Sequence, residues 1–169
     1  MTPALRTRLR RVRALVLDVD GVLTDGGMYY GNDGEVLKKF HTRDGMGIAL
    51  LREAGISVAF ITGEQTEIVR RRAAKLRVED VYLGVEEKGA ALQDFLKKRQ
   101  LKVEEVAYVG DDMNDLPCLK QVGLAIAVAD AMPQVRKAAH WVTRCRGGEG
   151  AVREVAELLL SFRHFHLDR

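Results

Sequence analysis

The sequence predicts an α/β fold in which a parallel sheet is flanked by helices. Five short apolar runs with the length of buried strands alternate with amphipathic stretches that have helical periodicity. Neighbouring parallel strands need long crossover connections, usually helices, and these cover both faces of the sheet. Several of the runs end directly in Asp or Thr. Ligands of open sheets bind at the carboxyl ends of the strands, so the functional site is expected there.

The alternation defines the expected elements. The strands are 14–17, 58–61, 81–83, 106–109 and 124–127, and the helices lie near 45–54, 65–76, 87–99, 113–121 and 150–162. One segment breaks the alternation, because two further strand-like runs, 28–30 and 35–40, flank the turn Gly31-Asn32-Asp33-Gly34. This composition predicts a β-hairpin over about residues 27–40, close to the mouth of the site.

Length and composition predict one globular domain spanning residues 1–169. Apolar residues make up 47% of the chain and charged residues 30%, and the net charge of +3 does not require a polyanionic partner. The arginine-rich stretch 6–13 is interpreted as a solvated lead-in to the first strand. Nucleic-acid binding is the weaker alternative, because no aromatic residues lie among the arginines.

Two observations indicate the compartment. No apolar run is long enough to cross a bilayer. Cys118 and Cys145 lack the spacing of a metal site, and two cysteines do not make a disulfide framework. We therefore expect a cytoplasmic protein with neither membrane nor nucleic acid as a partner.

The segment Asp18-Val19-Asp20-Gly21-Val22-Leu23-Thr24 directly follows the first apolar run. Two carboxylates one residue apart can divide a phosphoryl transfer between them. Asp18 would attack phosphorus, and Asp20 would protonate the leaving alkoxide and later deprotonate the hydrolytic water. An isolated Asp-x-Asp pair is more often a calcium ligand or a helix cap. The whole string behind an apolar strand is more specific, and Gly21 would let the backbone approach the phosphate closely.

A second acidic segment, Gly110-Asp111-Asp112-Met113-Asn114-Asp115, follows another apolar run. Its oxygen-rich side chains suit Mg²⁺, and Asp111 is best placed to bind the ion together with Asp18. The metal would offset the repulsion between the carboxylates and the phosphate. The alternative is that these acids cap the helix beginning near Met113. Asp112 is expected to do so, Asp115 to orient a lysine, and Asn114 to support the metal ligands.

Two single residues complete the candidate catalytic set. Thr62 offers a hydroxyl to a phosphoryl oxygen, next to the backbone donors around Gly63, and Lys88 offers a positive charge. Taken alone, a Thr-Gly pair is usually a turn and a lysine is usually solvated surface. Their order and position relative to the two acidic segments carry the prediction.

Asp18-x-Asp20, Thr62, Lys88 and Gly110-Asp111-Asp112-x-x-Asp115 together resemble the four motifs of haloacid-dehalogenase-like phosphatases. Segments 20–26, 30–35, 43–47 and 146–154 also resemble the subfamily acting on 2-keto-3-deoxy sugar-acid phosphates, so the likeness covers nearly the whole chain. That subfamily includes 3-deoxy-D-manno-octulosonate 8-phosphate phosphatases and nine-carbon ulosonate 9-phosphate phosphatases, such as those for KDN or sialic acid 9-phosphate.

The resemblance implies a Rossmann-like fold with only the hairpin in place of a cap domain. Mg²⁺ would be bound by the side chains of Asp18 and Asp111 and by the backbone carbonyl of Asp20. Four subunits would assemble through their hairpins, so that each site is closed partly by a neighbour. The stretch 147–150 and the tail after it would be mobile and could reach an adjacent site. The residues implied to line the substrate site are Asp20, His41, Thr42, Arg43, Asp44, Gly45, Thr62, Gly63, Glu64, Arg72, Lys75 and Lys88.

Two positions bear on the choice of substrate. Octulosonate phosphatases of this kind often carry arginine where this chain has Glu64 and Ala49, so segment 62–75 looks more similar to the nine-carbon enzymes. A glutamate accepts hydrogen bonds from sugar hydroxyls, whereas an arginine favours anionic groups. Arg72 and Lys75 lie three residues apart on one helix face and are expected to contact the sugar acid. The alternative for them is a solvated helix face.

The leading hypothesis is therefore an Mg²⁺-dependent phosphatase that removes the terminal phosphate of a 2-keto-3-deoxy sugar acid. One alternative is a phosphotransferase or phosphomutase of the same superfamily. Such an enzyme must exclude water, for which a hairpin alone is a poor lid. Another is a non-catalytic assembly module like the C-terminal domain of sialic-acid cytidylyltransferases. Such modules can lose the motif residues, all of which are present here.

Overall fold

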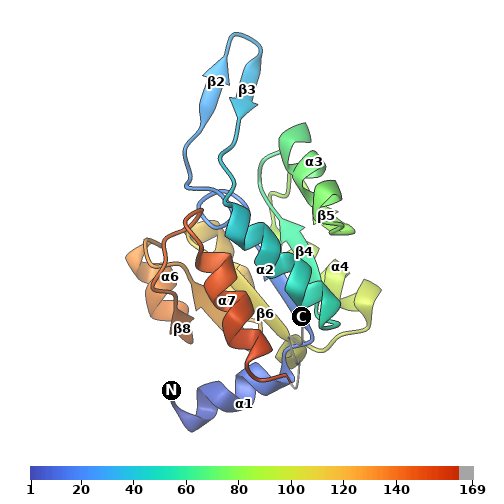
Figure 1. Ribbon diagram of the computed structural model, residues 1–169, viewed down its shortest axis with the longest axis vertical. Helices are drawn as coiled ribbons and strands as arrows, with labels where there is room; N and C mark the ends of the chain where they lie inside the picture. The colour runs from blue at the N-terminus through green and yellow to red at the C-terminus, as the bar shows by residue number, and fades with distance from the viewer. Residues whose placement is uncertain (164–169) are drawn as a thin grey trace.

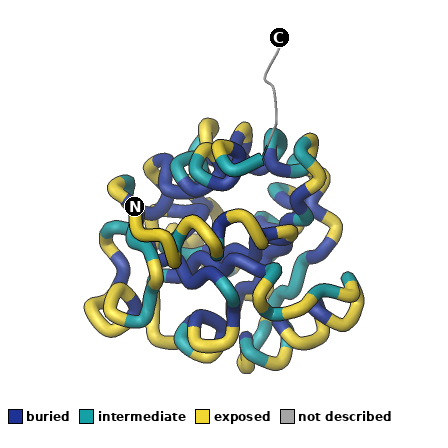
Figure 2. The backbone as a smooth tube through the Cα atoms, turned by 90° about the horizontal axis from the view of Figure 1, so that it is seen from below, coloured by how far each residue is buried: buried dark blue, intermediate teal, exposed yellow. Residues whose placement is uncertain are grey.

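The computed structural model describes residues 1–163 and has the parallel α/β architecture that the sequence predicts. Six strands form one parallel sheet in the order β5-β4-β1-β6-β7-β8. Their bounds are β1 (Ala14–Leu17), β4 (Ser57–Ile61), β5 (Asp80–Tyr82), β6 (Val106–Gly110), β7 (Leu124–Ala127) and β8 (Trp141–Val142). Every residue of β1, β6 and β7 is buried, as expected for strands covered on both faces. Figure 2 shows that buried residues fill the centre of the molecule, whereas exposed residues lie on its outer turns and helices.

The helices form layers on the two faces of the sheet. They are α1 (Pro3–Arg11), α2 (Thr42–Glu53), α3 (Glu67–Lys75), α4 (Lys88–Arg99), α5 (Leu116–Leu119), α6 (Pro133–Ala138) and α7 (Ala151–Leu160). Helices α2 and α7 pack side by side over one face (Figure 1). The order of strands reverses after β5, and right-handed crossovers then place α4, α5 and α6 on the opposite face, where they contact one another in turn.

Two 3₁₀ helices, η1 (Val103–Glu105) and η2 (Met113–Asp115), complete the elements and mark one departure from expectation. The helix predicted over 113–121 is η2 followed by the short α5. Helix α2 begins three residues earlier than predicted, so segment 42–44 is helical. Helix α6 and strand β8 were not predicted, and they are only six and two residues long.

Most of stretch 6–13, predicted to be a solvated lead-in to the first strand, belongs to helix α1, which the sequence did not predict. The Thr2 side chain accepts a hydrogen bond from the backbone N–H of Leu5 and caps the helix, with Pro3 at its first position. Leu9 is buried, and Arg8 donates a hydrogen bond to the carbonyl of Gly123. Arg6, Arg10 and Arg11 are exposed, and the helix packs across the amino-terminal end of the sheet.

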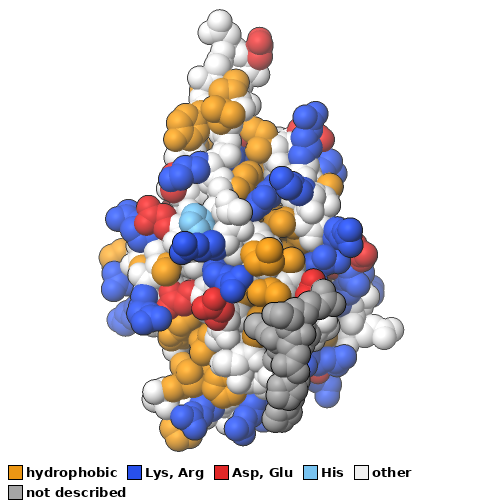
Figure 3. Space-filling model, viewed as in Figure 1, with side chains coloured by type: hydrophobic (Ala, Val, Ile, Leu, Met, Phe, Trp, Pro, Cys, Tyr) orange, Lys and Arg blue, Asp and Glu red, His pale blue; other side chains and the backbone are white. Residues whose placement is uncertain are grey.

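The predicted hairpin is present as β2 (Tyr29–Gly31) and β3 (Gly34–Leu37), an antiparallel pair that projects away from the sheet (Figure 1). A bridge between Thr24 and Phe40 closes its base. Its large apolar side chains are exposed, with Tyr30 at 63% and Leu37 at 60% (Figure 3). A two-stranded ribbon with exposed apolar side chains gains little stability from its own packing.

Among residues 1–163, no helix has both the length and the apolar character needed to cross a bilayer.

Candidate active site

Three polar side chains that are far apart in the sequence meet at one edge of the sheet. Strand β1 pairs with β4 on one side and β6 on the other, with Leu17 level with Phe60 and Val109. The next residues along these strands include Asp18, Thr62 and Asp111. Strands β4 and β5 lie on one side of β1, and the strands from β6 onward lie on its other side. Open α/β sheets bind ligands at such a switch point. A cavity of about 180 Å³ lies here, lined by Asp18, Asp20, Thr62, Gly63, Glu64, Lys88, Asp111, Asp112 and Asn114.

Lys88, the first residue of α4, bridges two buried carboxylates. Its Nζ lies 2.7 Å from Asp18 Oδ1 and 2.8 Å from Asp115 Oδ1. Burial alone would lower the pKa of Lys88, but the two carboxylates raise it above its usual value, so the ammonium keeps its charge. Burial, followed by the negative charge of Asp115, raises the pKa of Asp18 well above its usual range, and Lys88 opposes this shift. The site thus holds one fixed cation against several carboxylates.

Asp115, which the sequence predicts to orient a lysine, accepts hydrogen bonds at both of its oxygens. Oδ1 accepts from Lys88 and from the hydroxyl of Tyr108, at 2.8 and 2.7 Å. Oδ2 accepts from the backbone N–H groups of Asp111 and Asp112, at 2.9 and 3.3 Å. Asp112 itself caps η2 through a 2.6 Å hydrogen bond from Met113 N, as expected. Tyr108 was not predicted, since a tyrosine inside a buried strand reads as core.

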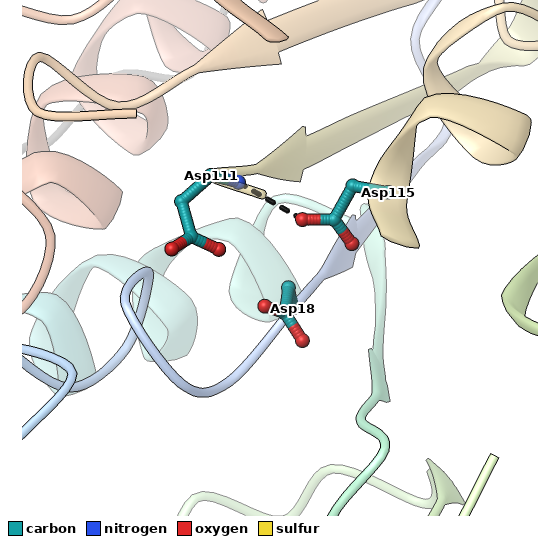
Figure 4. A group of neighbouring side chains, drawn as sticks. All are labelled: Asp18, Asp111 and Asp115. Carbon is teal, nitrogen blue, oxygen red and sulfur yellow. Dashed lines mark hydrogen bonds between the residues drawn. The ribbon is translucent and has the colours of Figure 1, made fainter. Parts of the chain in front are cut away.

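Asp18 and Asp111 are the residues suited to hold a cation. Oxygens of Asp18, Asp111 and Asp115 lie within 4.8 Å of one another, and Asp18 and Asp111 face the same space (Figure 4). Asp111 Oδ1 is buried and has no hydrogen-bond partner among residues 1–163. Asp115 is already saturated by its donors, so Asp18 and Asp111 offer the free ligand atoms. This donor set fits a hard divalent cation such as Mg²⁺.

Gly21 is required for this approach of the two acidic segments. Its φ of +87° lies in the left-handed region, and a Cβ built on it would lie 2.1 Å from Asp111 Oδ2. Any side chain at this position would push Asp111 away from Asp18.

Asp20 lies at the mouth of the cavity between two side chains. Thr62 Oγ1 lies 3.4 Å from Asp20 Oδ2, and Lys38 Nζ lies 2.6 Å from Asp20 Oδ1. Thr62 also accepts a hydrogen bond from the backbone N–H of Glu64 at 3.2 Å, which fixes its hydroxyl. The contact with Lys38 was not predicted, because nothing in the hairpin sequence distinguishes Lys38 from its neighbour Lys39.

The remaining predicted substrate residues, except Asp44, line a second cavity. It has a volume of about 830 Å³ and is lined by His41, Thr42, Arg43, Gly45, Met46, Ala49, Arg72, Lys75, Leu76, Arg144, Cys145, Glu149, Gly150, Arg153, Glu154 and Glu157. The two cavities share no lining residue in the part of the chain that the structure describes. Glu64 therefore belongs with the acidic segments, whereas Arg72 and Lys75 belong with α2 and α7.

Asp44 does not have the position expected of a substrate residue. It is 1% exposed and lines neither cavity. Its carboxylate accepts hydrogen bonds from the backbone N–H groups of Gly150 and Arg153, at 3.3 and 2.7 Å, and so caps the amino terminus of α7. The expectation for Asp44 is corrected accordingly: it joins α2 to α7.

The glycine-rich stretch 147–150 was expected to be mobile, but the structure packs it against the first acidic loop. Gly148 N donates to Val22 O at 3.0 Å, and Gly147 N donates to Asp130 Oδ1 at 3.0 Å. The tail was also expected to reach an adjacent site, and its residues 164–169 lie outside the described residues. The stretch therefore supports the loop that carries Asp18 and Asp20.

Comparisons with known proteins agree with this geometry. A family model described as haloacid dehalogenase-like hydrolase matches residues 83–155. The chain is 48% identical over 160 residues to a 3-deoxy-D-manno-octulosonate 8-phosphate phosphatase of Salmonella typhimurium, covering 95% of this chain and 85% of that one.

Two solved structures carry related names. An octulosonate 8-phosphate phosphatase from Moraxella catarrhalis, in complex with magnesium, phosphate and a KDO molecule, has a TM-score of 0.93 at 35% identity, covering 96% of this chain and 94% of that one. The cobalt-bound form of a deoxy-D-mannose-octulosonate 8-phosphate phosphatase from Haemophilus influenzae has a TM-score of 0.90 at 42% identity, covering 92% and 91%. Both of these structures contain a bound metal, magnesium in the first and cobalt in the second.

Proposed function

The chain belongs to the haloacid dehalogenase-like hydrolase family and is a phosphoric monoester hydrolase, and from this premise we propose that it removes the terminal phosphate of 3-deoxy-D-manno-octulosonate 8-phosphate. One observation carries the proposal. Asp18, Asp111, Thr62 and Lys88 converge on one small cavity in a chain that is about half identical to phosphatases of that name.

The side chains at this cavity suit an aspartyl-phosphate mechanism. An Asp18 oxygen attacks phosphorus, the bond from phosphorus to the sugar oxygen breaks, and Asp20 gives its proton to the leaving alkoxide. In the second step Asp20 takes a proton from water, the water oxygen attacks phosphorus, and the bond to Asp18 breaks. Thr62 donates to a phosphoryl oxygen. Lys88 holds Asp18 in place and balances its negative charge.

Asp18 and Asp111 would hold Mg²⁺, together with the backbone carbonyl of Asp20. When bound, the ion neutralises charge on the phosphate and on the two carboxylates. The unpaired, buried Asp111 Oδ1 supports this assignment.

The size of the catalytic cavity supports a shared site between subunits. Its volume of about 180 Å³ is below the roughly 300–1,000 Å³ of typical small-molecule sites, so the sugar acid extends beyond it. We propose that the exposed apolar hairpins join four subunits and that a neighbouring chain covers the sugar acid. The second cavity, with Arg72 and Lys75, offers cationic groups for a carboxylate.

A nine-carbon ulosonate 9-phosphate is the competing substrate, and Glu64 is the observation in its favour. Glu64 lines the catalytic cavity, where a carboxylate can accept hydrogen bonds from sugar hydroxyls. The octulosonate is placed first because the named relatives act on it.

The test is phosphate release by the purified protein with Mg²⁺ from the eight-carbon and nine-carbon substrates in parallel. We expect inorganic phosphate from the octulosonate with the higher kcat/KM. Asp18→Asn keeps the shape of the side chain and should lower kcat by roughly a thousandfold or more, because it removes the nucleophile. Asp25→Asn, a control carboxylate paired with Lys39 at the surface, should retain activity. Retained activity in Asp18→Asn would exclude the mechanism, and turnover of unrelated phosphates alone would exclude the substrate.

A further inference from the structure

Lys38 is a buried lysine at the base of the hairpin. Its side chain has no exposed surface, whereas that of the next residue, Lys39, is 57% exposed. Lysine is almost never fully buried unless its charge is paired. Lys38 follows directly after β3, and its side chain reaches Asp20 in the first acidic loop.

Two carboxylates pair with this ammonium group. Lys38 Nζ lies 2.6 Å from Asp20 Oδ1 and 2.7 Å from Glu35 Oε1. Burial would lower the pKa of Lys38, but these two carboxylates raise it above its usual value, so the group is a cation. The negative charge of Glu35 balances the positive charge of Lys38. The Lys38–Glu35 pair therefore brings no net charge to Asp20.

We propose that Lys38 is a positioning residue that holds the carboxyl group of Asp20 toward the leaving-group oxygen, an inference that rests on the proposed function. Lys38 occupies Oδ1 of Asp20, and Oδ2 then lies beside Thr62 Oγ1 at 3.4 Å, on the side of the phosphoryl site. Asp20 is otherwise partly exposed, with 27% of its side chain accessible, so without this contact it could turn toward solvent.

The proposal predicts a loss that depends on the leaving group. Positioned proton donation matters for a basic leaving group, such as a sugar alkoxide or unsubstituted phenolate, and matters little for p-nitrophenolate, which leaves without a proton. A purely structural role of Lys38 would lower activity on all esters alike. The parameter to compare is kcat/KM, since it reports the steps up to departure of the leaving group.

The experiment uses Lys38→Met with a series of aryl phosphates, from p-nitrophenyl to unsubstituted phenyl, and an alkyl phosphate. General acid catalysis contributes a factor of about 10²–10⁴, so we expect kcat/KM to fall roughly ten- to hundredfold on the alkyl ester and less than about threefold on p-nitrophenyl phosphate. Lys38→Arg retains a donor and should recover most of the alkyl activity. Lys39→Met removes only a surface ion pair and serves as the matched control.

Equal losses across the series, or no loss at all, would overturn the proposal. Lys38→Met leaves Glu35 buried beside no cation and can fail to fold, which circular dichroism would show. The double variant Lys38→Met with Glu35→Gln removes that unpaired charge and must show the same dependence on the leaving group. The wild-type protein separates the two claims: activity on the aryl series without activity on octulosonate 8-phosphate would reject the substrate but leave the role of Lys38 to be decided by the variants. A wild-type protein inactive on every ester would reject both.

Discussion

At the scale of single residues, the site concentrates charge that ordinary cores exclude. Asp18, Lys88 and Asp115 are each at most 4% exposed, and Asp111 stands beside them with an unpaired oxygen. Ionised carboxylates in such surroundings are costly unless a cation or hydrogen-bond donors compensate them. Lys88 compensates Asp18 and Asp115, but among residues 1–163 no side-chain cation contacts Asp111.

This imbalance gives a prediction for the metal-free protein. Burial, followed by the charge of Asp115, raises the pKa of Asp111 to about 6, whereas an unfolded chain loses this proton near pH 4. Between these values the folded state holds a proton that the unfolded state has released. The contribution of Asp111 to the unfolding free energy therefore falls by about 2 kcal/mol as the pH rises from 4 to 6 and stays low above that.

The variant Asp111→Asn isolates this contribution in urea unfolding with a chelator present. We expect Asp111→Asn to be more stable than the wild type by about 2 kcal/mol at pH 7, with the difference vanishing near pH 4. Added Mg²⁺ should reverse the order, because ligand binding to the folded state stabilises only the protein that binds it. A difference that is independent of pH would show that Asp111 is not held in a charge-penalised environment.

At the scale of elements, Asp44 fastens the first turn of α2 to the start of α7. Its carboxylate accepts the N–H groups of Gly150 and Arg153, which would otherwise be unsatisfied and buried. We expect Asp44→Ala to lower the unfolding free energy by about 1–3 kcal/mol, measured by urea denaturation. Glu53→Ala, an exposed position on the same helix, should change it by less than about 0.5 kcal/mol. A loss of substrate affinity without a loss of stability would restore Asp44 to the substrate site.

The hairpin exposes apolar side chains that do not contribute to the core and that subunit assembly would bury. Tyr30, Val36 and Leu37 are 53–63% exposed on a two-stranded ribbon. If the hairpins join four subunits, a charge in this surface must be buried on assembly at high cost. Leu37→Asp should therefore yield smaller species in light scattering, while circular dichroism stays unchanged. Asp33→Ala, in the turn, should assemble as the wild type does. A wild-type protein that is already monomeric would end the proposal of a shared site.

At the scale of the whole molecule, the features visible in sequence are those set by local pattern. Each of the five predicted strands is found within one or two residues, because a run such as 106–109 can only be buried between two layers. The order of strands then brings Asp18, Thr62 and Asp111 together without further information. Lys88, which taken alone would be assigned to solvated surface, was predicted from its order and position relative to the two acidic segments.

Features that depend on distant partners were not visible. Asp44 meets Gly150, a residue 106 positions away, and no local signal separates such a cap from a substrate contact. Lys38 and Lys39 are adjacent and chemically identical, yet one is buried against Asp20 and the other is solvated. Helix α1 was not predicted because its anchors, Leu9 and the contact of Arg8 with Gly123, require the folded sheet.

The contact that joins the two ends of the fold gives the last prediction. A Cβ on Gly147 would lie 1.7 Å from Gly21 O. Gly147→Ala must therefore shift Gly21 and, with it, the loop that carries Asp18 and Asp20. Misplacement by about 1 Å can lower kcat by about a hundredfold. Gly123→Ala meets equally rigid backbone, at 2.4 Å from Glu104 O, but far from the site along the sheet. Both variants should lose stability by about 1–3 kcal/mol in urea denaturation, and only Gly147→Ala should lose kcat; equal kcat values would show that the stretch does not position the catalytic loop.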